Sequence, residues 1–103
     1  MNKTEIKNNI IEGIKTIYDP EIPINIYELG LIYEVEVQEE GKIHVLMTLT
    51  APACPAAEFI PAEVKTKAMG VEGVEEVEVE ITFEPPWTKE MMSEEAMLEL
   101  GFM

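Results

Sequence analysis

The chain has 103 residues, of which 47% are hydrophobic, and its 21 acidic and 7 basic residues give a formal net charge of -14 at pH 7. This length suits a single domain over residues 1–103, with enough apolar residues to offset the entropy of ordering the chain. The acidic charge argues against binding to nucleic acid or to an anionic membrane surface, because it repels phosphate groups, and it favours a basic partner or plain solubility.

Isoleucines at helical spacing predict a first helix near the N-terminus, which Thr4 can cap. Asp19-Pro20 is expected to end this helix, because proline disfavours helical geometry in the residue before it. The connection 19–30 is too proline-rich for a helix and too apolar for a solvated linker, so we expect it to pack against the body of the domain. The apolar stripe of the helix consists of Ile6, Ile10, Ile14 and Ile17, widened by Ile11 and Tyr18.

Residues 31–38 and 43–49 alternate between apolar and polar side chains, and Glu39-Glu40-Gly41 separates them. This pattern predicts a β-hairpin with one apolar face. Keeping both apolar sets on that face fixes the register, because a slip of one residue would turn one set over. The predicted pairs are Val37 with Ile43, Val35 with Val45, Tyr33 with Met47 and Leu31 with Leu49, with Glu36 opposite His44 on the outer face.

A second helix follows, for which Pro55 suits the first position and Cys54 the N-cap. Pro61 would break the hydrogen bonding of a helix that began so early. We therefore expect either a kink at Pro61 or a helix that begins near it. The predicted inward face consists of Phe59, Ile60, Val64 and Ala68, and Gly70 and Gly73 end the segment.

A third strand is predicted where apolar residues alternate with glutamates, and Pro85-Pro86 stops it. Ser93 can cap a last helix over residues 94–100, with Gly101 as its C-terminal stop. The apolar residues of the strand are Val77, Val79, Ile81 and Phe83.

The element order is therefore α-β-β-α-β with a C-terminal helix. Because the predicted strands have one polar and one apolar face, the economical packing is a single sheet with helices on one side. We predict an α+β fold with one three-stranded mixed sheet and its helices packed on one face.

Five short motifs occur along the chain: Asp19-Pro20-Glu21, Leu29-Gly30-Leu31-Ile32-Tyr33, Met47-Thr48-Leu49-Thr50, Cys54-Pro55 and Pro85-Pro86-Trp87. In this order and at this spacing they resemble the MIP18 family, the "domain of unknown function 59" (DUF59) group that includes SufT-like iron–sulfur maturation proteins. The resemblance covers essentially the whole chain. It implies a fold like the C-terminal domain of NifU-type scaffolds. It also implies a role in assembling or delivering iron–sulfur clusters, with the assembly machinery and client apoproteins as partners.

Related domains of that family occur fused to cluster-carrier ATPases and in the phenylacetate-degradation accessory protein PaaD. This chain has no Walker loop, so ATPase activity is not expected. It also has no cysteine-rich extension, which weakens the interpretation as a PaaD-like accessory protein.

Cys54 is the only cysteine, so the chain cannot form an internal disulfide. No apolar run approaches the roughly 20 residues of a membrane-spanning helix. Residues 1–9 also lack the apolar core of a secretion signal. These features predict a cytoplasmic protein with no membrane partner, in a reducing compartment where a thiol stays free.

Cys54 is the main candidate site residue. A thiolate at a helix N-terminus has a lowered pKa, because unpaired N–H groups and the helix dipole stabilise it, and this makes it a better metal ligand. The alternative is a buried structural cysteine, the more usual state of a lone cysteine. The family motif and the flanking prolines favour the metal-ligand role.

One thiolate cannot hold an iron–sulfur cluster, since such clusters usually take four protein ligands. Cys54 must therefore share a transient cluster with a second subunit, a partner or a small thiol, and no cluster is expected to be bound permanently by one chain. A homodimer that brings two copies of Cys54 together is the simplest arrangement.

Asp19 and Thr50 are the other candidate residues near Cys54. The family motif places Asp19 in the site, where it can orient the loop or lend an oxygen to a metal; termination of the first helix is the alternative. Thr48 and Thr50 read as polar outer-face residues, with Thr50 the better placed to touch the loop. Trp87 is either a lid over the site or an anchored core aromatic. Met91, Met92 and Met97 are more typical of packing than of copper binding.

Three functions are compatible with these residues. The first is an accessory protein for iron–sulfur cluster assembly or delivery, with no enzymatic activity. The second is a metal-free adaptor that recruits client proteins, which includes a PaaD-like role. The third, a thiol enzyme, is the weakest. His44 is the only histidine, and it lies six residues before Thr50, roughly 20 Å along a strand. His44 is better explained as a surface residue paired with Glu36.

Overall fold

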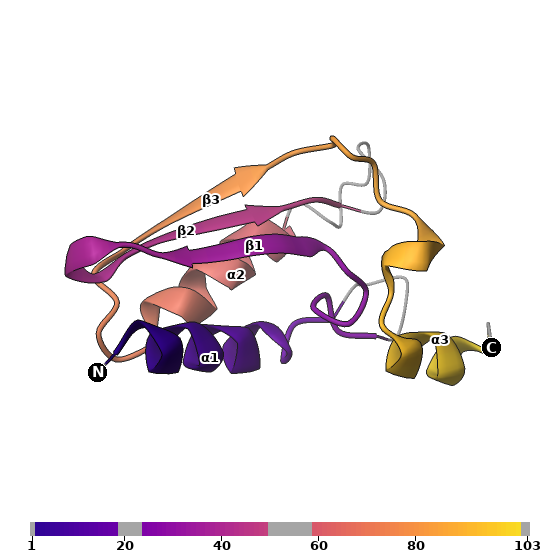
Figure 1. Ribbon diagram of the computed structural model, residues 1–103, viewed down its shortest axis with the longest axis horizontal. Helices are drawn as coiled ribbons and strands as arrows, with labels where there is room; N and C mark the ends of the chain where they lie inside the picture. Colours follow the sequence, from indigo (N-terminus) through magenta and orange to yellow (C-terminus); the bar gives the residue numbers. More distant parts are fainter. Residues whose placement is uncertain (1, 19–23, 50–58, 102–103) are drawn as a thin grey trace.

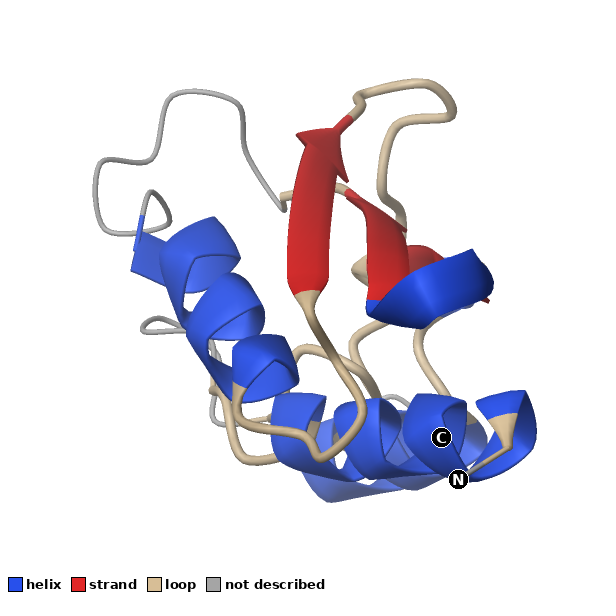
Figure 2. Cartoon of the chain, turned by 90° about the vertical axis from the view of Figure 1, so that its left-hand side faces the viewer, coloured by secondary structure: helices blue, strands red, loops and turns tan. Residues whose placement is uncertain are grey.

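The computed structural model describes residues 2–18, 24–49 and 59–101. Its elements are α1 (Lys3–Ile14), β1 (Ile32–Val37), η1 (Glu39–Gly41), β2 (Lys42–Met47), α2 (Phe59–Met69), β3 (Glu76–Ile81), η3 (Lys89–Met91) and α3 (Glu94–Leu100). The strands form one sheet in the order β1-β2-β3, in which β2 is antiparallel to β1 and parallel to β3. α1 and α2 lie on one side of this sheet, and α3 lies beyond its end (Figures 1 and 2). The predicted α+β fold with a mixed sheet is confirmed.

The core lies between the sheet and the two helices that cover it. It consists of apolar side chains from one face of each strand and from the facing sides of α1 and α2, as the apolar periodicity predicts. Segment 24–31 adds to it, so the expectation that the connection packs against the domain is confirmed for its described residues, 24–30. The most deeply buried apolar side chains are Ile10, Ile14, Ile17, Ile26, Leu29, Leu31, Val45, Met47 and Val64.

α1 begins and ends earlier than the sequence predicts. Its N-cap is Asn2, not Thr4, since the side chain of Asn2 accepts a hydrogen bond from the Glu5 N–H at 2.8 Å. The helix ends at Ile14, and Ile17 and Tyr18 then pair with the next segment. The N–H of Ile26 donates to the carbonyl of Ile17 at 2.9 Å. Pairing between chain segments therefore ends the helix before Asp19-Pro20 is reached.

The hairpin register is confirmed over half its length. Val37 pairs with Ile43, Val35 with Val45 and Glu36 with His44. The predicted pairing of Tyr33 with Met47 is wrong, because a bulge between Ile32 and Glu34 brings Ile32 opposite Met47. The prediction for Leu31 and Leu49 is also wrong, since the carbonyl of Leu31 accepts from the N–H of Thr48 at 2.8 Å. Tyr33 turns out of the pairing, and its hydroxyl donates to the carbonyl of Pro85 at 2.8 Å.

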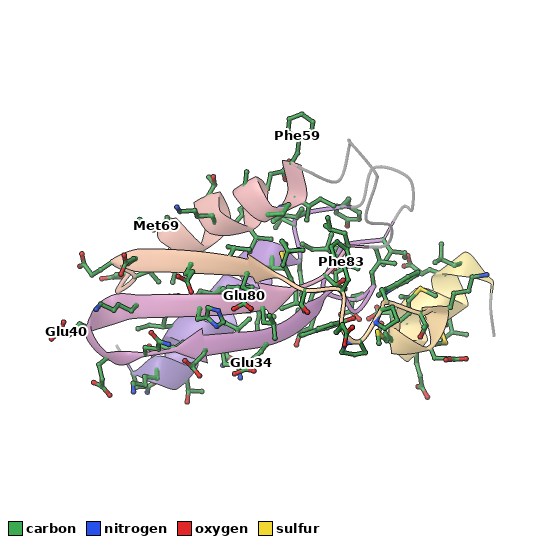
Figure 3. The ribbon with its side chains drawn as sticks, turned by 90° about the horizontal axis from the view of Figure 1, so that it is seen from above. Glu34, Glu40, Phe59, Met69, Glu80 and Phe83 are labelled. Carbon is green, nitrogen blue, oxygen red and sulfur yellow. The ribbon has the colours of Figure 1, made fainter. Side chains whose placement is uncertain are left out.

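Three aromatic residues that the pattern places on apolar faces are exposed, and Tyr18 is one of them, at 59%. The inward face of α2 is confirmed for Ile60, Val64 and Ala68, but the side chain of Phe59 is 70% exposed and points away from the body (Figure 3). Phe83 follows the end of β3 and is 41% exposed. Periodicity identifies one face of an element, but it does not tell whether a residue at the end of that face, such as Phe59 at the start of α2, reaches the layer opposite. The predicted N-cap of this helix, Cys54, lies outside the described residues.

The C-terminal helix agrees with its prediction at both ends. The side chain of Ser93 accepts a hydrogen bond from the Ala96 N–H at 3.1 Å, and Gly101 has a left-handed φ of 79°. At the opposite end of the molecule, the ammonium of Lys3 lies 2.7 Å from the carboxylate of Glu39. This contact lowers the pKa of Glu39 from its ordinary value of 4.5, chiefly through the hydrogen bond. Its contribution to stability is therefore lost as the pH falls through the lowered pKa.

Replacing Gly30 by alanine should destabilise the fold far more than the same change at Gly101. Both glycines have positive φ, 86° and 79°, where a Cβ costs roughly 1–2 kcal/mol. At Gly30 a Cβ would also lie 2.3 Å from the carbonyl oxygen of Met91, whereas nothing lies within 4 Å at Gly101. Urea unfolding followed by circular dichroism should show Gly30→Ala less stable than Gly101→Ala by about 2 kcal/mol or more. Equal unfolding midpoints would contradict the close approach of Gly30 to Met91.

Candidate functional site

The three predicted site residues lie outside the described residues. Asp19 belongs to segment 19–23, and Thr50 and Cys54 belong to segment 50–58. What the structure does describe is the framework to which both segments are attached, and the remaining candidates, Thr48, Trp87, His44 and the methionines.

Segment 50–58 joins the end of β2 to α2, and α2 leads to β3, which runs parallel to β2. Cys54 therefore belongs to the connection that leaves the carboxyl end of a parallel strand. Connections at this end of parallel strands are common places for ligand binding, because the loops and the helix N-termini gather there on a rigid sheet.

The end of β2 is held from both sides directly before Thr50. The N–H of Thr48 donates to the carbonyl of Leu31 at 2.8 Å, and the carbonyl of Met47 accepts from the N–H of Thr82 at 2.9 Å. Thr48 is completely buried, so the expectation of a polar residue on a solvated face is wrong.

The chain on either side of segment 19–23 is also held in place. Tyr18 and Asn25, which stand on either side of it, form an antiparallel β-bridge. The turn that follows is bonded internally, from the N–H of Leu29 to the carbonyl of Asn25 at 3.1 Å. The N–H of Leu31 then donates to the carbonyl of Ile26 at 3.1 Å. This turn thus connects the bridge between Tyr18 and Asn25 to Leu31, and Leu31 is bonded in turn to the end of β2.

Trp87 is an anchored aromatic of this framework. Its indole N–H donates to the carbonyl of Leu29 at 2.7 Å, and its half-buried ring packs against the core. Of the two interpretations that the sequence left open, the structure favours the core aromatic over the lid. The chain after Trp87 returns to the same turn, where the N–H of Ser93 donates to the carbonyl of Glu28 at 2.9 Å.

His44 lies on the outer face of the sheet, and its imidazole contacts carboxylates of β3. Its Nε2 is 3.0 Å from the carboxylate of Glu80 and 3.6 Å from that of Glu78. Glu36 is its Cα partner in β1, as predicted, but the described contacts of the imidazole are with β3. Strand pairing explains the difference, because His44 lies on the central strand between two rows of glutamates.

No group of three or more histidine, cysteine, aspartate or glutamate side chains in residues 2–18, 24–49 and 59–101 is arranged to hold a metal ion. The methionines behave as packing residues, since Met92 is buried and Met91 and Met97 are half-buried. The sulfur of Met91 lies 3.5 Å from the hydroxyl of Tyr33. No helix in the described part of the chain is both long and apolar enough to cross a membrane.

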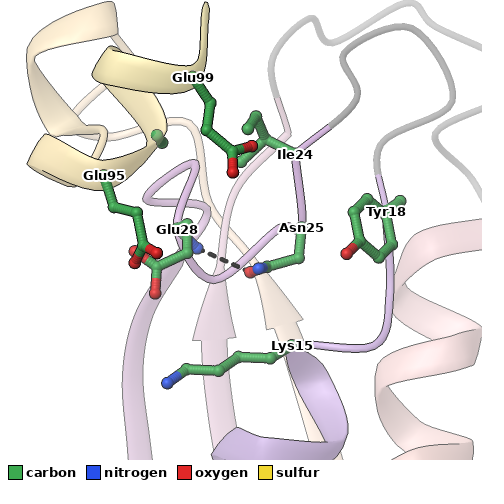
Figure 4. A pocket seen from close by; sticks show the side chains of 8 residues that line it. Lys15, Tyr18, Ile24, Asn25, Glu28, Glu95 and Glu99 are labelled. Carbon is green, nitrogen blue, oxygen red and sulfur yellow. Dashed lines mark hydrogen bonds between the residues drawn. The ribbon is translucent and has the colours of Figure 1, made fainter.

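A cavity of about 350 Å³, which the sequence did not predict, lies between the end of α1, the turn at residues 24–28 and α3 (Figure 4). Three carboxylates line it, from Glu28, Glu95 and Glu99. Lys15 also borders the cavity, but its ammonium lies 3.8 Å from Glu12 and 5.3 Å from the centre of the Tyr27 ring. Such a lining attracts cations and repels anions. No sequence pattern distinguishes these glutamates from ordinary solvated ones.

Comparison with known proteins places the chain in a family of iron–sulfur cluster assembly proteins. A family profile described as "Iron-sulfur cluster assembly protein" matches residues 7–81. The chain is 56% identical over 99 residues to an "Fe-S protein maturation auxiliary factor" of Porphyromonas gingivalis, which covers 96% of this chain and 94% of that protein. It is 45% identical over 85 residues to the "Fe-S protein maturation auxiliary factor SufT" of Staphylococcus aureus, covering 82% and 97% of the two chains.

A solved structure supports the same relationship. The crystal structure of a domain of unknown function, DUF59, from Bacillus anthracis superimposes with a TM-score of 0.88 at 35% sequence identity. The match covers 97% of this chain and 95% of that one. The fold described above is therefore shared along nearly the whole length of both chains.

Replacing Trp87 by phenylalanine should destabilise the framework more than replacing Tyr33 by phenylalanine. Trp87→Phe leaves the carbonyl of Leu29 without the indole donor in a partly buried place, whereas the hydrogen bond of Tyr33 to Pro85 is exposed. An unsatisfied buried group costs about 1–3 kcal/mol, and loss of an exposed bond costs about 1 kcal/mol or less. Chemical denaturation of both variants checks the order. A larger loss of stability for Tyr33→Phe would contradict the role of Trp87 as the anchor.

Proposed function

This chain belongs to the iron–sulfur cluster assembly protein family, and from that membership we propose that it is a cytoplasmic accessory protein that helps to assemble iron–sulfur clusters or to deliver them to client proteins. The observation that carries the proposal is the 56% identity, over 96% of the chain, to a protein named as an Fe-S protein maturation auxiliary factor. The whole of residues 1–103 acts as one domain in this role, and it catalyses no reaction of its own.

Cys54 is the proposed ligand for the cluster in transit. Three observations support this: it is the only thiol in the chain, it belongs to the connection after a parallel strand, and the strand end before it is held from both sides. Asp19 is proposed to orient the loop or to add an oxygen ligand, and Thr50 to contact the loop. Asp19 follows Tyr18, which is bridged to Asn25, and Thr50 comes two residues after Thr48, which is bonded to Leu31. The turn at residues 24–31 connects these two places.

The cluster is cargo in this proposal, not a resident cofactor. One thiolate supplies one of the roughly four ligands that a cluster takes, so the others come from a second copy of this chain, from the assembly machinery, from the client apoprotein or from a small thiol. A homodimer that shares a cluster between two Cys54 thiolates is the simplest arrangement of this kind.

The alternative is a metal-free adaptor that recruits client proteins. The net charge of -14 favours it as much as it favours a cluster carrier, because an acidic surface attracts basic partners. The two functions differ in one respect only, which is whether the thiol of Cys54 touches iron.

Cys54→Ala should leave the fold intact and abolish the accessory activity. In cells that lack the native protein, this variant should restore a cluster-dependent client enzyme no better than an empty control, while the wild type restores it. Ala53→Ser is the matched control, because it changes the neighbouring residue and keeps the thiol. Circular dichroism establishes that the variants are folded. Normal client activity with Cys54→Ala would count against the cluster-ligand role.

Anaerobic reconstitution with iron and sulfide distinguishes the carrier from the adaptor. The wild type should develop a visible chromophore that Cys54→Ala does not develop, and size-exclusion chromatography should show whether two chains share it. Absence of any cysteine-dependent chromophore, together with retained binding to client proteins, would establish the adaptor instead.

A further inference from the structure

The two edges of the sheet are built differently. The edge formed by β1 is interrupted by the bulge at Tyr33. The edge formed by β3 is regular: six consecutive residues, from Glu76 to Ile81, pair with β2 without a bulge or a proline. Natural proteins interrupt exposed edges to prevent other chains from pairing with them. Within the described part of the chain the edge of β3 has neither a bulge nor a proline, and its protection is the charge of its glutamates, which repels acidic strands but attracts basic ones.

The register determines which backbone groups of β3 face outward. Met47 pairs with Ile81, and its carbonyl accepts from the N–H of Thr82. In a parallel ladder, alternate residues bond to the neighbouring strand, so the amides of Glu78 and Glu80 face β2 and those between them face away. Apart from the sheet ladder, no hydrogen bond to Val77, Val79 or Ile81 occurs among the described backbone groups.

The side chains of β3 give this edge a defined chemistry. Glu76, Glu78 and Glu80 are exposed on the outer face of the sheet. On the helical side, Val79 and Ile81 are only half-buried, although the matching residues of the central strand are fully buried. The edge therefore carries a row of carboxylates on the outer face of the sheet and a row of incompletely covered apolar side chains on the helical face.

The helix beside this edge extends the apolar row. In Figure 3, α2 is seen past the free edge of β3, and Figure 2 shows it on the helical side of the sheet. Met69 at its end is 44% exposed, and Phe59 at its beginning is 70% exposed. A strand added next to β3 would therefore lie over part of α2 and cover apolar surface that the fold leaves open.

We propose that the free edge of β3 is a docking site for an extended segment of a partner protein in which basic residues alternate with apolar ones. Such a segment would continue the sheet through main-chain hydrogen bonds, as in β-strand addition. Its basic side chains would pair with the glutamates on the outer face, and its apolar side chains would lie over α2. A second copy of this chain is disfavoured as the occupant, because it would set like-charged glutamates opposite one another.

The test uses a synthetic nine-residue peptide in which lysine and valine alternate, added to the full chain. Amide hydrogen exchange at Val77 and Val79 should slow by about tenfold or more, because these N–H groups become bonded to the peptide. Exchange at Glu78 and Glu80 should change little, since their amides already face β2. A peptide with the same composition in scrambled order and one in which glutamate replaces lysine are the controls, and neither should slow exchange.

Two sets of variants check the contributions of main-chain hydrogen bonds and of charge to the affinity for the peptide. Val79→Pro removes an outward N–H at a position where an edge strand tolerates proline, and should weaken binding of the alternating peptide by about tenfold. Glu76→Gln with Glu78→Gln should weaken it by about threefold or more. The matched control is Glu34→Gln with Glu36→Gln, which removes the same charge from the opposite edge strand and should have a smaller effect.

Several results would overturn the proposal. Equal binding of the alternating and scrambled peptides would mean that charge alone attracts them. Slowed exchange on β1, or none on β3, would place the contact elsewhere. Exchange at Val77 that slows with protein concentration in the absence of peptide would identify a second copy as the occupant.

Discussion

The close contact between the turn at Gly30 and the chain at Met91 is the constraint on which the framework depends. Gly30 has a left-handed backbone and no room for a side chain, because the carbonyl of Met91 lies against it. This approach lets the indole of Trp87 reach the carbonyl of Leu29. It also leaves Leu31 free to accept the N–H of Thr48 at the end of β2. One turn therefore fixes the C-terminal segment and the strand end that precedes Cys54.

Much of the fold could be predicted because it depends on local periodicity. Alternating residues gave the three strands, and Ser93 and Gly101 gave both ends of the last helix. The errors arise where distant segments decide the outcome. Tyr33, at the bulge, bonds to Pro85, which lies 52 residues away, and α1 ends early where Ile17 bonds to Ile26. No local pattern contains that information.

The candidate site was predicted in a different way. Cys54 stands out because it is the only thiol, and Asp19 and Thr50 stand out only through the family motifs. Periodicity cannot supply the other ligands of a cluster, since in the proposed function they come from another molecule. Thr48 shows the limit most clearly: its hydroxyl suggested a solvated residue, yet it is completely buried.

A single thiolate is better suited to transfer than a complete ligand set would be. A carrier that supplied all four ligands would hold the cluster tightly, and delivery would require a client with still higher affinity. A chain that supplies one ligand lowers that barrier, because a client can replace the remaining ligands one at a time. The cost is weak retention, which must be offset by contacts elsewhere between carrier and client. A strand edge that binds an extended segment would supply such contacts without touching the cluster, and so would let recognition and cluster affinity be set independently.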